Sequence, residues 1–146
     1  MTPLVVDASV VIKWLLPELH SGAARRVLSK DNELLAPDLL WAEVGNVLWK
    51  RCRARQITAD DARELLRDFK RFPVSIIPSI LLISAALDIA TGLNRTVYDS
   101  LYLALAMSRR CRLVTGDRRL YDGLKRGPLA PALLWVEDVS EGHGAS

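Results

Sequence analysis

Four acidic residues, each beside a predicted strand or on a predicted helix, are the side chains of this sequence that could perform chemistry together. Asp7 ends a short apolar run at residues 4–6, and Asp117 follows another such run, at 112–115, by two residues. Because ligands of an open parallel sheet bind at the carboxyl ends of its strands, we expect both acids at one edge of the sheet. Each would also serve as an ordinary helix N-cap, a position that favours Asp.

The other two acids lie on helix faces that are otherwise apolar. Glu43 shares a helical stripe with Leu40 and Val47, where an unpaired carboxylate is costly. A salt bridge at the edge of the stripe would explain Glu43 as well as a functional role would. Asp99 is the third residue of a predicted capping box that begins at Thr96, and it also lies on the helix face that we expect to be buried.

If these acids converge, their charges repel one another, and some would hold a proton unless a cation were present. A hard divalent ion such as Mg²⁺ or Mn²⁺ prefers carboxylate and water oxygens, so it would relieve the repulsion. Such a site polarises a phosphodiester and activates a water molecule for in-line attack. The pattern therefore indicates metal-dependent hydrolysis, with Asp7, Glu43, Asp99 and Asp117 as metal ligands and catalytic residues.

Motifs for several other chemistries are absent from the sequence. It contains no GxxxxGK[ST] or GxGxxG loop, so nothing indicates the use of a nucleoside triphosphate or a dinucleotide, and it contains no GxSxG elbow. His20 and His143 fall in polar surroundings, where solvent exposure explains them better than general-base catalysis does. Cys52 and Cys111 have no CxxC spacing, so we expect two reduced, buried thiols rather than a disulfide or a zinc site.

Predicted strands alternate with predicted helices along the chain. The strands are expected at 4–6, 34–36, 74–77, 112–115 and 133–136. The helices are expected at 9–16, 20–29, 38–53, from 58 onward, 79–91, 96–108 and 118–125, with Ser79 capping the fifth and Gly92 ending it. This alternation predicts an α/β fold with a central, mostly parallel sheet.

Composition limits the number of domains and the class of protein. The 146 residues are half hydrophobic and one quarter charged, with a formal net charge of +3. We expect one domain over residues 1–140 and a disordered polar tail at 141–146. The apolar run at 74–90 is short for a membrane span and is interrupted by Pro78 and Asp88. No signal-peptide pattern is visible, so we expect a cytoplasmic protein that makes no contact with a membrane.

Three segments together resemble a known family. LVVDASVVIKWLLPE at 4–18, APDLLWAEVGNVLWK at 36–50 and TVYDSLYLALAMSRRCRLVTGDRRL at 96–120 carry the four acids. In their order and spacing they resemble the PIN-domain family, and in particular the VapC toxins of bacterial toxin–antitoxin pairs. The resemblance implies a three-layer α/β/α sandwich with a sheet of four to five strands. It also implies an endoribonuclease that depends on Mg²⁺ or Mn²⁺.

The resemblance also implies supporting residues and partners. Ser9 matches a polar position that supports the first acid, and Thr115 matches one beside the fourth, although a helix N-cap and a strand-end hydroxyl explain these two equally well. The implied partners are the RNA substrate, a small cognate antitoxin and a second copy of the chain. The basic stretch at residues 51–71 corresponds to a protruding arm in the family, but its interspersed acids also suit an ordinary solvated helix face. Large apolar residues that look exposed also favour a partner or a homodimer, although core packing explains at least one of them better; they are Trp14, Trp41 and Trp49.

Three other classes of protein compete with this interpretation. A phosphatase of the haloacid dehalogenase type places an Asp after its first strand but needs a second acid two residues later, where this chain has Ser9. A phosphoacceptor receiver domain wants paired acids, whereas Asp7 lies between Val6 and Ala8. A non-catalytic module that binds nucleic acid or protein would explain the basic stretch and leave the four acids unexplained.

Overall fold

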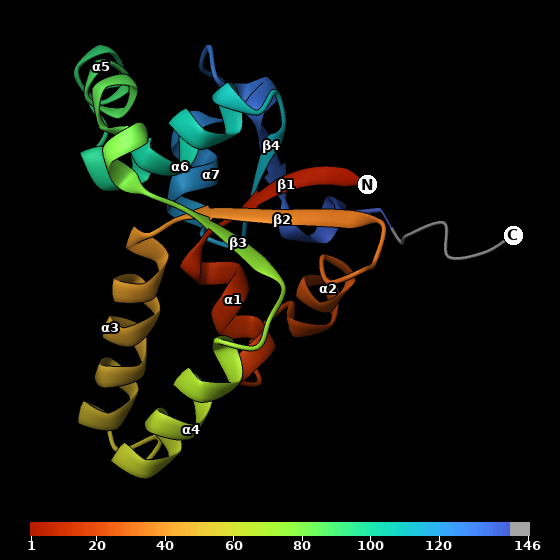
Figure 1. Ribbon diagram of the computed structural model, residues 1–146, viewed down its shortest axis with the longest axis vertical. Helices are drawn as coiled ribbons and strands as arrows, with labels where there is room; N and C mark the ends of the chain where they lie inside the picture. The colour runs from red at the N-terminus through yellow and green to blue at the C-terminus, as the bar shows by residue number, and fades with distance from the viewer. Residues whose placement is uncertain (141–146) are drawn as a thin grey trace, which may run out of the picture.

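In residues 1–140, which the computed structural model describes, five parallel strands form one sheet with helices on both faces (Figure 1). The strands are β1 (Thr2–Val6), β2 (Asn32–Pro37), β3 (Val74–Ile77), β4 (Arg112–Thr115) and β5 (Leu133–Trp135). Their order across the sheet is β3-β2-β1-β4-β5, and every neighbouring pair is parallel. The predicted α/β class with a parallel sheet is confirmed.

The central strand β1 is apolar on both of its faces because helices cover both. Val6 packs into the core beneath one face, while Val5 packs into the core beneath the other. From β1 the chain first builds β2 and β3 on one side and then returns to build β4 and β5 on the other. The strand order therefore reverses between β1 and β4, and the carboxyl ends of these two strands frame the position where open α/β sheets bind ligands.

The helices form the two outer layers of the sandwich. One layer contains α1 (Ala8–Leu15), α2 (Ser21–Arg26), α3 (Leu39–Arg53) and α4 (Ala59–Phe69), and the other contains α5 (Ile83–Leu93), α6 (Val97–Ser108) and α7 (Arg118–Leu124). Short 3₁₀ turns occur at η1 (Ser79–Leu81), η2 (Ala130–Ala132) and η3 (Val136–Asp138). Figure 1 shows α3 and α4 running away from the sheet and back as a pair, which forms the predicted arm.

Local capping signals predicted most helix ends, and the structure corrects two of them. Ser79 begins the short turn η1 rather than a long helix, and its hydroxyl donates to Asp38, which leaves α3 without a side-chain cap. Helix α5 continues through Gly92 and ends at Asn94, whose φ of 53° lies in the left-handed region. Asn tolerates this conformation better than most residues, so it can end a helix as Gly does.

Three further expectations concern exposure and the chain end. Cys52 and Cys111 are free thiols but are only half-buried, so their predicted burial is wrong in degree. None of the helices in residues 1–140 combines the length and the apolar character needed to cross a membrane. The tail predicted at 141–146 lies outside the described residues.

Candidate active site

One cleft at the carboxyl edge of the sheet is lined by all four acids that the sequence singled out. The cleft has a volume of about 530 Å³, and its walls include Asp7, Glu43, Asp99 and Asp117. Asp7 caps α1 directly after β1, and Asp117 caps α7 after β4. Glu43 comes from the second turn of α3 and Asp99 from the first turn of α6. Four separate elements therefore bring one carboxylate each to the same cavity.

Asp7 is the most buried of the four acids, with only 7% of its surface exposed. Its Oδ1 accepts a hydrogen bond from the Ser9 hydroxyl at 2.5 Å and another from the Val10 N–H at 3.3 Å. Burial raises the pKa of Asp7 to about 6; the hydrogen bonds from Ser9, Thr115 and Val10 oppose that rise, and the nearby charge of Asp117 adds to it. Ionisation of Asp7 at neutral pH therefore lowers the free energy of unfolding of the domain.

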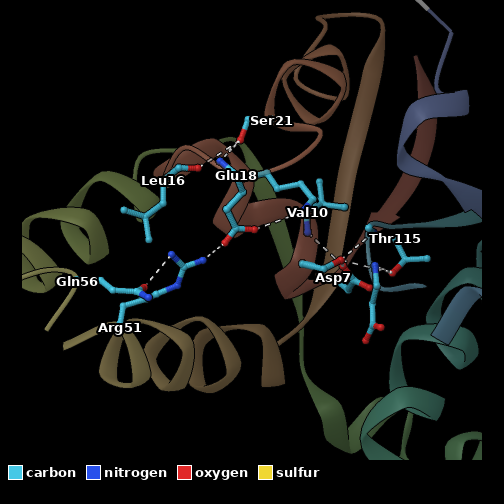
Figure 2. A network of polar contacts seen from close by, with 12 residues as sticks. Asp7, Val10, Leu16, Glu18, Ser21, Arg51, Gln56 and Thr115 are labelled. Carbon is cyan, nitrogen blue, oxygen red and sulfur yellow. Dashed lines mark hydrogen bonds and ion pairs between the residues drawn. The ribbon is translucent and has the colours of Figure 1, made fainter. Parts of the chain in front are cut away.

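Ser9 and Thr115, the two predicted supporting residues, connect the turns that follow β1 and β4. Ser9 Oγ accepts from the Gly116 N–H at 2.8 Å and lies 3.4 Å from Thr115 Oγ1. Thr115 Oγ1 in turn accepts from the Asp117 N–H at 3.0 Å. Figure 2 shows Asp7 and Thr115 lying together where the two strands end. These hydroxyls therefore fix Asp7 and Asp117 relative to each other. Thr115 itself is fully buried, so it acts only through these contacts.

Glu43 is bonded by a tyrosine from the opposite helix layer. The Tyr102 hydroxyl donates to Glu43 Oε1 at 2.5 Å, so the structure shows a phenol where a salt bridge was the alternative explanation. Burial raises the pKa of Glu43, and the charge of Asp99 raises it further. Burial and the neighbouring Glu43 charge also raise the pKa of Tyr102, which keeps its proton and remains a donor. The sequence did not identify Tyr102, although it lies one helical turn after Asp99 on the same face.

The other two acids are bonded by groups from their own chain neighbourhood. The Asp99 N–H donates to the Thr96 hydroxyl, but the Asp99 carboxylate accepts from Arg95 at 3.1 Å instead of from the Thr96 N–H. Only half of the predicted capping box therefore forms. Asp117 is exposed, and its Oδ1 accepts from the backbone N–H groups of Arg119 and Leu120 at 3.0 and 3.3 Å. Asp117 thus serves as an N-cap as well as lining the cleft.

At the end of the cleft away from the sheet edge, Glu18, Asn46 and Lys50 contribute to the wall. Glu18 accepts from buried Lys13 at 3.2 Å. It also accepts from Arg51, as Figure 2 shows. A Cβ at Gly116 would lie 2.7 Å from Lys13 Cε, so a side chain in the turn beside Asp117 would force Lys13 to shift. The sequence did not identify this ion-pair chain, because its members become neighbours only in the fold.

The donor set fits a hard divalent cation. Carboxylate oxygens are the ligands that Mg²⁺ and Mn²⁺ prefer, and a bound cation would oppose the burial and the like charges that raise the pKa values of Asp7 and Glu43. In the conformation described for residues 1–140, no three of these acids are close enough together to ligate one ion. Small rotations of the carboxylates that line the cleft would be needed to bring three of them onto one ion.

A family model described as PIN domain matches residues 4–123, which contain all four acids. The chain belongs to the PIN-domain family. The similarity extends to individual proteins: Ribonuclease VapC3 of Pyrobaculum aerophilum is 38% identical over 121 residues, covering 80% of this chain and 91% of that protein.

Solved structures share the fold of this PIN domain. The crystal structure of PAE2754 from Pyrobaculum aerophilum superposes with a TM-score of 0.68 at 24% identity, covering 93% of this chain and 85% of that one. A toxin–antitoxin complex from Klebsiella pneumoniae contains a chain with a TM-score of 0.61 at 15% identity, with coverage of 93% and 99% respectively. At these identities the likeness establishes the architecture alone.

The raised pKa of Asp7 predicts how the stability of this PIN domain depends on pH when metal is absent. The folded pKa of about 6 lies above the unfolded value of 3.8, so the folded state binds more protons between these values and stability falls as pH rises through them. Above the folded pKa, the ionised carboxylate costs about 3 kcal/mol. Asp7→Asn should therefore raise the free energy of unfolding near neutral pH by about 1–3 kcal/mol and flatten its change over this window.

Urea unfolding in EDTA, at about pH 4.5 and about pH 7.5, measures this difference. Asp88→Asn on the exposed surface of α5 is the matched control and should leave the pH dependence as it is in the wild type. An Asp7→Asn protein with the wild-type pH dependence would show that the buried charge of Asp7 carries no such cost.

Proposed function

We propose that this PIN domain is an endoribonuclease that hydrolyses RNA with Mg²⁺ or Mn²⁺ and acts as the toxin of a toxin–antitoxin pair. The observation that carries the proposal is the convergence of four carboxylates, from four different elements, on one cleft at the point where the strand order reverses. The name of the similar protein, Ribonuclease VapC3, supports the reaction class.

Each acid has a proposed role that follows from its surroundings. Asp7, Glu43 and Asp99 would hold the ion, and Asp117, exposed and partly committed to capping α7, would lie at the rim of its ligand set. When bound, the ion would polarise the scissile phosphodiester and make water a better nucleophile at neutral pH. Tyr102 keeps Glu43 oriented by donating a hydrogen bond to it, and Ser9 does the same for Asp7.

Groups around the acids fit a single-stranded RNA. Tyr98 lines the cleft and is 63% exposed, so its ring is free to stack on a nucleotide base. Lys50 and Asn46 line the cleft from α3 and would contact the phosphate backbone on one side of the cut. Beyond them, Arg53 stacks over the exposed ring of Trp49, which extends the basic and aromatic surface along the arm.

The proposed partners are a small cognate antitoxin and a second copy of the chain, with both toxin and RNA in the cytoplasm. The likeness to a chain of a toxin–antitoxin complex supports the antitoxin. The three tryptophans that motivated the dimer give it little support. Trp14 is buried with its Nε1–H bonded to the Ala24 carbonyl, and Trp41 packs on Phe69. Trp49 is the most exposed of the three, at 54%.

A different surface supports the homodimer. Four large apolar side chains of η1 and α5 are exposed by 39–79%, and they are Ile80, Leu81, Ile83 and Leu87. They occupy one short turn and the first half of the following helix, a contiguous apolar stretch of the kind that marks a protein interface. The same face from a second copy would cover it, as in a two-fold symmetric dimer.

The nuclease prediction concerns metal, products and the four acids. Cleavage of a single-stranded RNA should require Mg²⁺ or Mn²⁺, stop with EDTA and leave 5′-phosphate and 3′-hydroxyl ends, because water rather than the RNA 2′-hydroxyl attacks. Asp7→Asn, Glu43→Gln and Asp99→Asn should each lower the cleavage rate by about two orders of magnitude or more, and Asp117→Asn should lower it less.

The controls separate chemistry from folding. Asp60→Asn, on the exposed start of α4, should cleave like the wild type. Circular dichroism should show that every variant keeps the wild-type helix content. Ends carrying a 2′,3′-cyclic phosphate would contradict the hydrolytic mechanism, and RNA binding without cleavage would favour the non-catalytic module.

The dimer prediction tests the η1–α5 face. Light scattering after size exclusion should give the mass of two chains for the wild type and of one chain for Leu81→Glu or Leu87→Glu, since a buried charge opposes the apolar contact. Met107→Glu, which changes an exposed apolar residue on α6, should remain a dimer. A wild type that runs as a monomer at micromolar concentration would refute the homodimer.

A further inference from the structure

Arg95 approaches the candidate metal site from the junction between α5 and α6. Asn94 ends α5 in the left-handed conformation, and the Arg95 N–H then donates to the Ala90 carbonyl at 3.2 Å. This sharp stop places Arg95 just before α6, four residues ahead of Asp99. The Arg95 guanidinium donates through Nη2 to Asp99 Oδ2 at 3.1 Å, with the two side chains 24% and 37% exposed.

Helix α7 leaves room for this arginine by having a glycine, Gly123, in its last turn. A Cβ at Gly123 would lie 2.8 Å from Arg95 Nη1. The backbone of Gly123 has no positive φ, so its conformation suits any residue, and an alanine would favour the helix more. A side chain at this position would therefore displace the Arg95 guanidinium from where it now lies.

The arginine is held in place at some expense to its own hydrogen bonding. Its Nε is buried and has no hydrogen-bond partner within residues 1–140. Buried polar atoms of this kind are rare in folded proteins, because the lost hydration is not replaced. A side chain chosen for stability alone would not leave this atom unsatisfied, which indicates that the position of the guanidinium serves the site.

We infer that Arg95 is a positioning residue that holds Asp99 Oδ2 and thereby presents Oδ1 to the metal. This role rests on the proposed metal-dependent function. Two effects of opposite sign are at work: the charge of Arg95 repels a cation, whereas its hydrogen bond orders a ligand that would otherwise rotate freely. Partners that orient metal ligands typically contribute about 10–100-fold to affinity, so ordering outweighs repulsion here.

Calorimetric titration with Mn²⁺ alone tests the sign of the effect. Arg95→Gln should bind Mn²⁺ about 10-fold more weakly than the wild type. Arg95→Lys, which keeps the charge but loses the planar fork, should fall between the two. Arg119→Gln, which removes an exposed positive charge at the start of α7, is the charge control and should bind Mn²⁺ at least as tightly as the wild type.

A second variant reaches Arg95 without altering any charge. Gly123→Ala should push the guanidinium off Asp99 and weaken Mn²⁺ binding, while leaving metal-free thermal stability equal or higher. Gly92→Ala, an exposed helix glycine with open space around it, should leave Mn²⁺ affinity unchanged. In the Arg95→Gln background, Gly123→Ala should add no further loss, because the two changes act through one contact.

The possible failures are distinguishable. Equal or tighter Mn²⁺ binding by Arg95→Gln would overturn the positioning role and leave the nuclease proposal intact. If Arg95→Gln lowers thermal stability but leaves Mn²⁺ affinity unchanged, Arg95 is merely structural, which would also overturn the positioning role. If the wild type itself fails to bind Mn²⁺, the proposed metal-dependent function fails first.

Discussion

The buried carboxylate of Asp7 is the constraint around which the rest of the site is arranged. It follows the central strand of the sheet, where helices on both faces exclude water, and burial raises its pKa to about 6. The fold offsets part of this cost locally. The Ser9 hydroxyl and the first turn of α1 donate to the carboxylate, and the same hydroxyl accepts from the turn after β4. The Ser9 hydroxyl thus connects the ionisation of Asp7 to the place where the strand order reverses, between β1 and β4.

Each remaining acid meets the same problem with a different partner. Tyr102 donates a neutral hydrogen bond to Glu43, Arg95 neutralises Asp99, and the first N–H groups of α7 bond Asp117. These partners hold four like charges around one cleft without collapse of the site, but they leave two of the pKa values raised. A divalent cation would stabilise the ionised forms of these two carboxylates. For this reason the arrangement of the acids favours our proposal of metal-dependent chemistry over a binding role.

Local sequence signals predicted the parallel sheet and most of the helices, since strands and caps depend on neighbouring residues, and they singled out four acids that the fold brings to one cleft. The catalytic role of these acids stays a prediction. The local signals failed where a contact joins segments distant in the chain, or where one local contact replaces another. Tyr102 and Glu43 are 59 residues apart in the chain, so no spacing rule pairs them. The Thr96 capping box is incomplete because Arg95 competes for the Asp99 carboxylate. Trp14 is buried because α2 supplies a carbonyl to its ring nitrogen, a contact that its own helix does not reveal.

The titration of the Asp7 carboxyl carbon, followed by ¹³C nuclear magnetic resonance, tests this account most directly. In EDTA the Asp7 signal should titrate with a midpoint near 6, as burial requires. With saturating Mg²⁺ the midpoint should fall by about two units or more, because the ion stabilises the charged form. A midpoint near the ordinary value of 3.8 in EDTA, or one near 6 that Mg²⁺ leaves unchanged, would contradict the central place given to this buried charge.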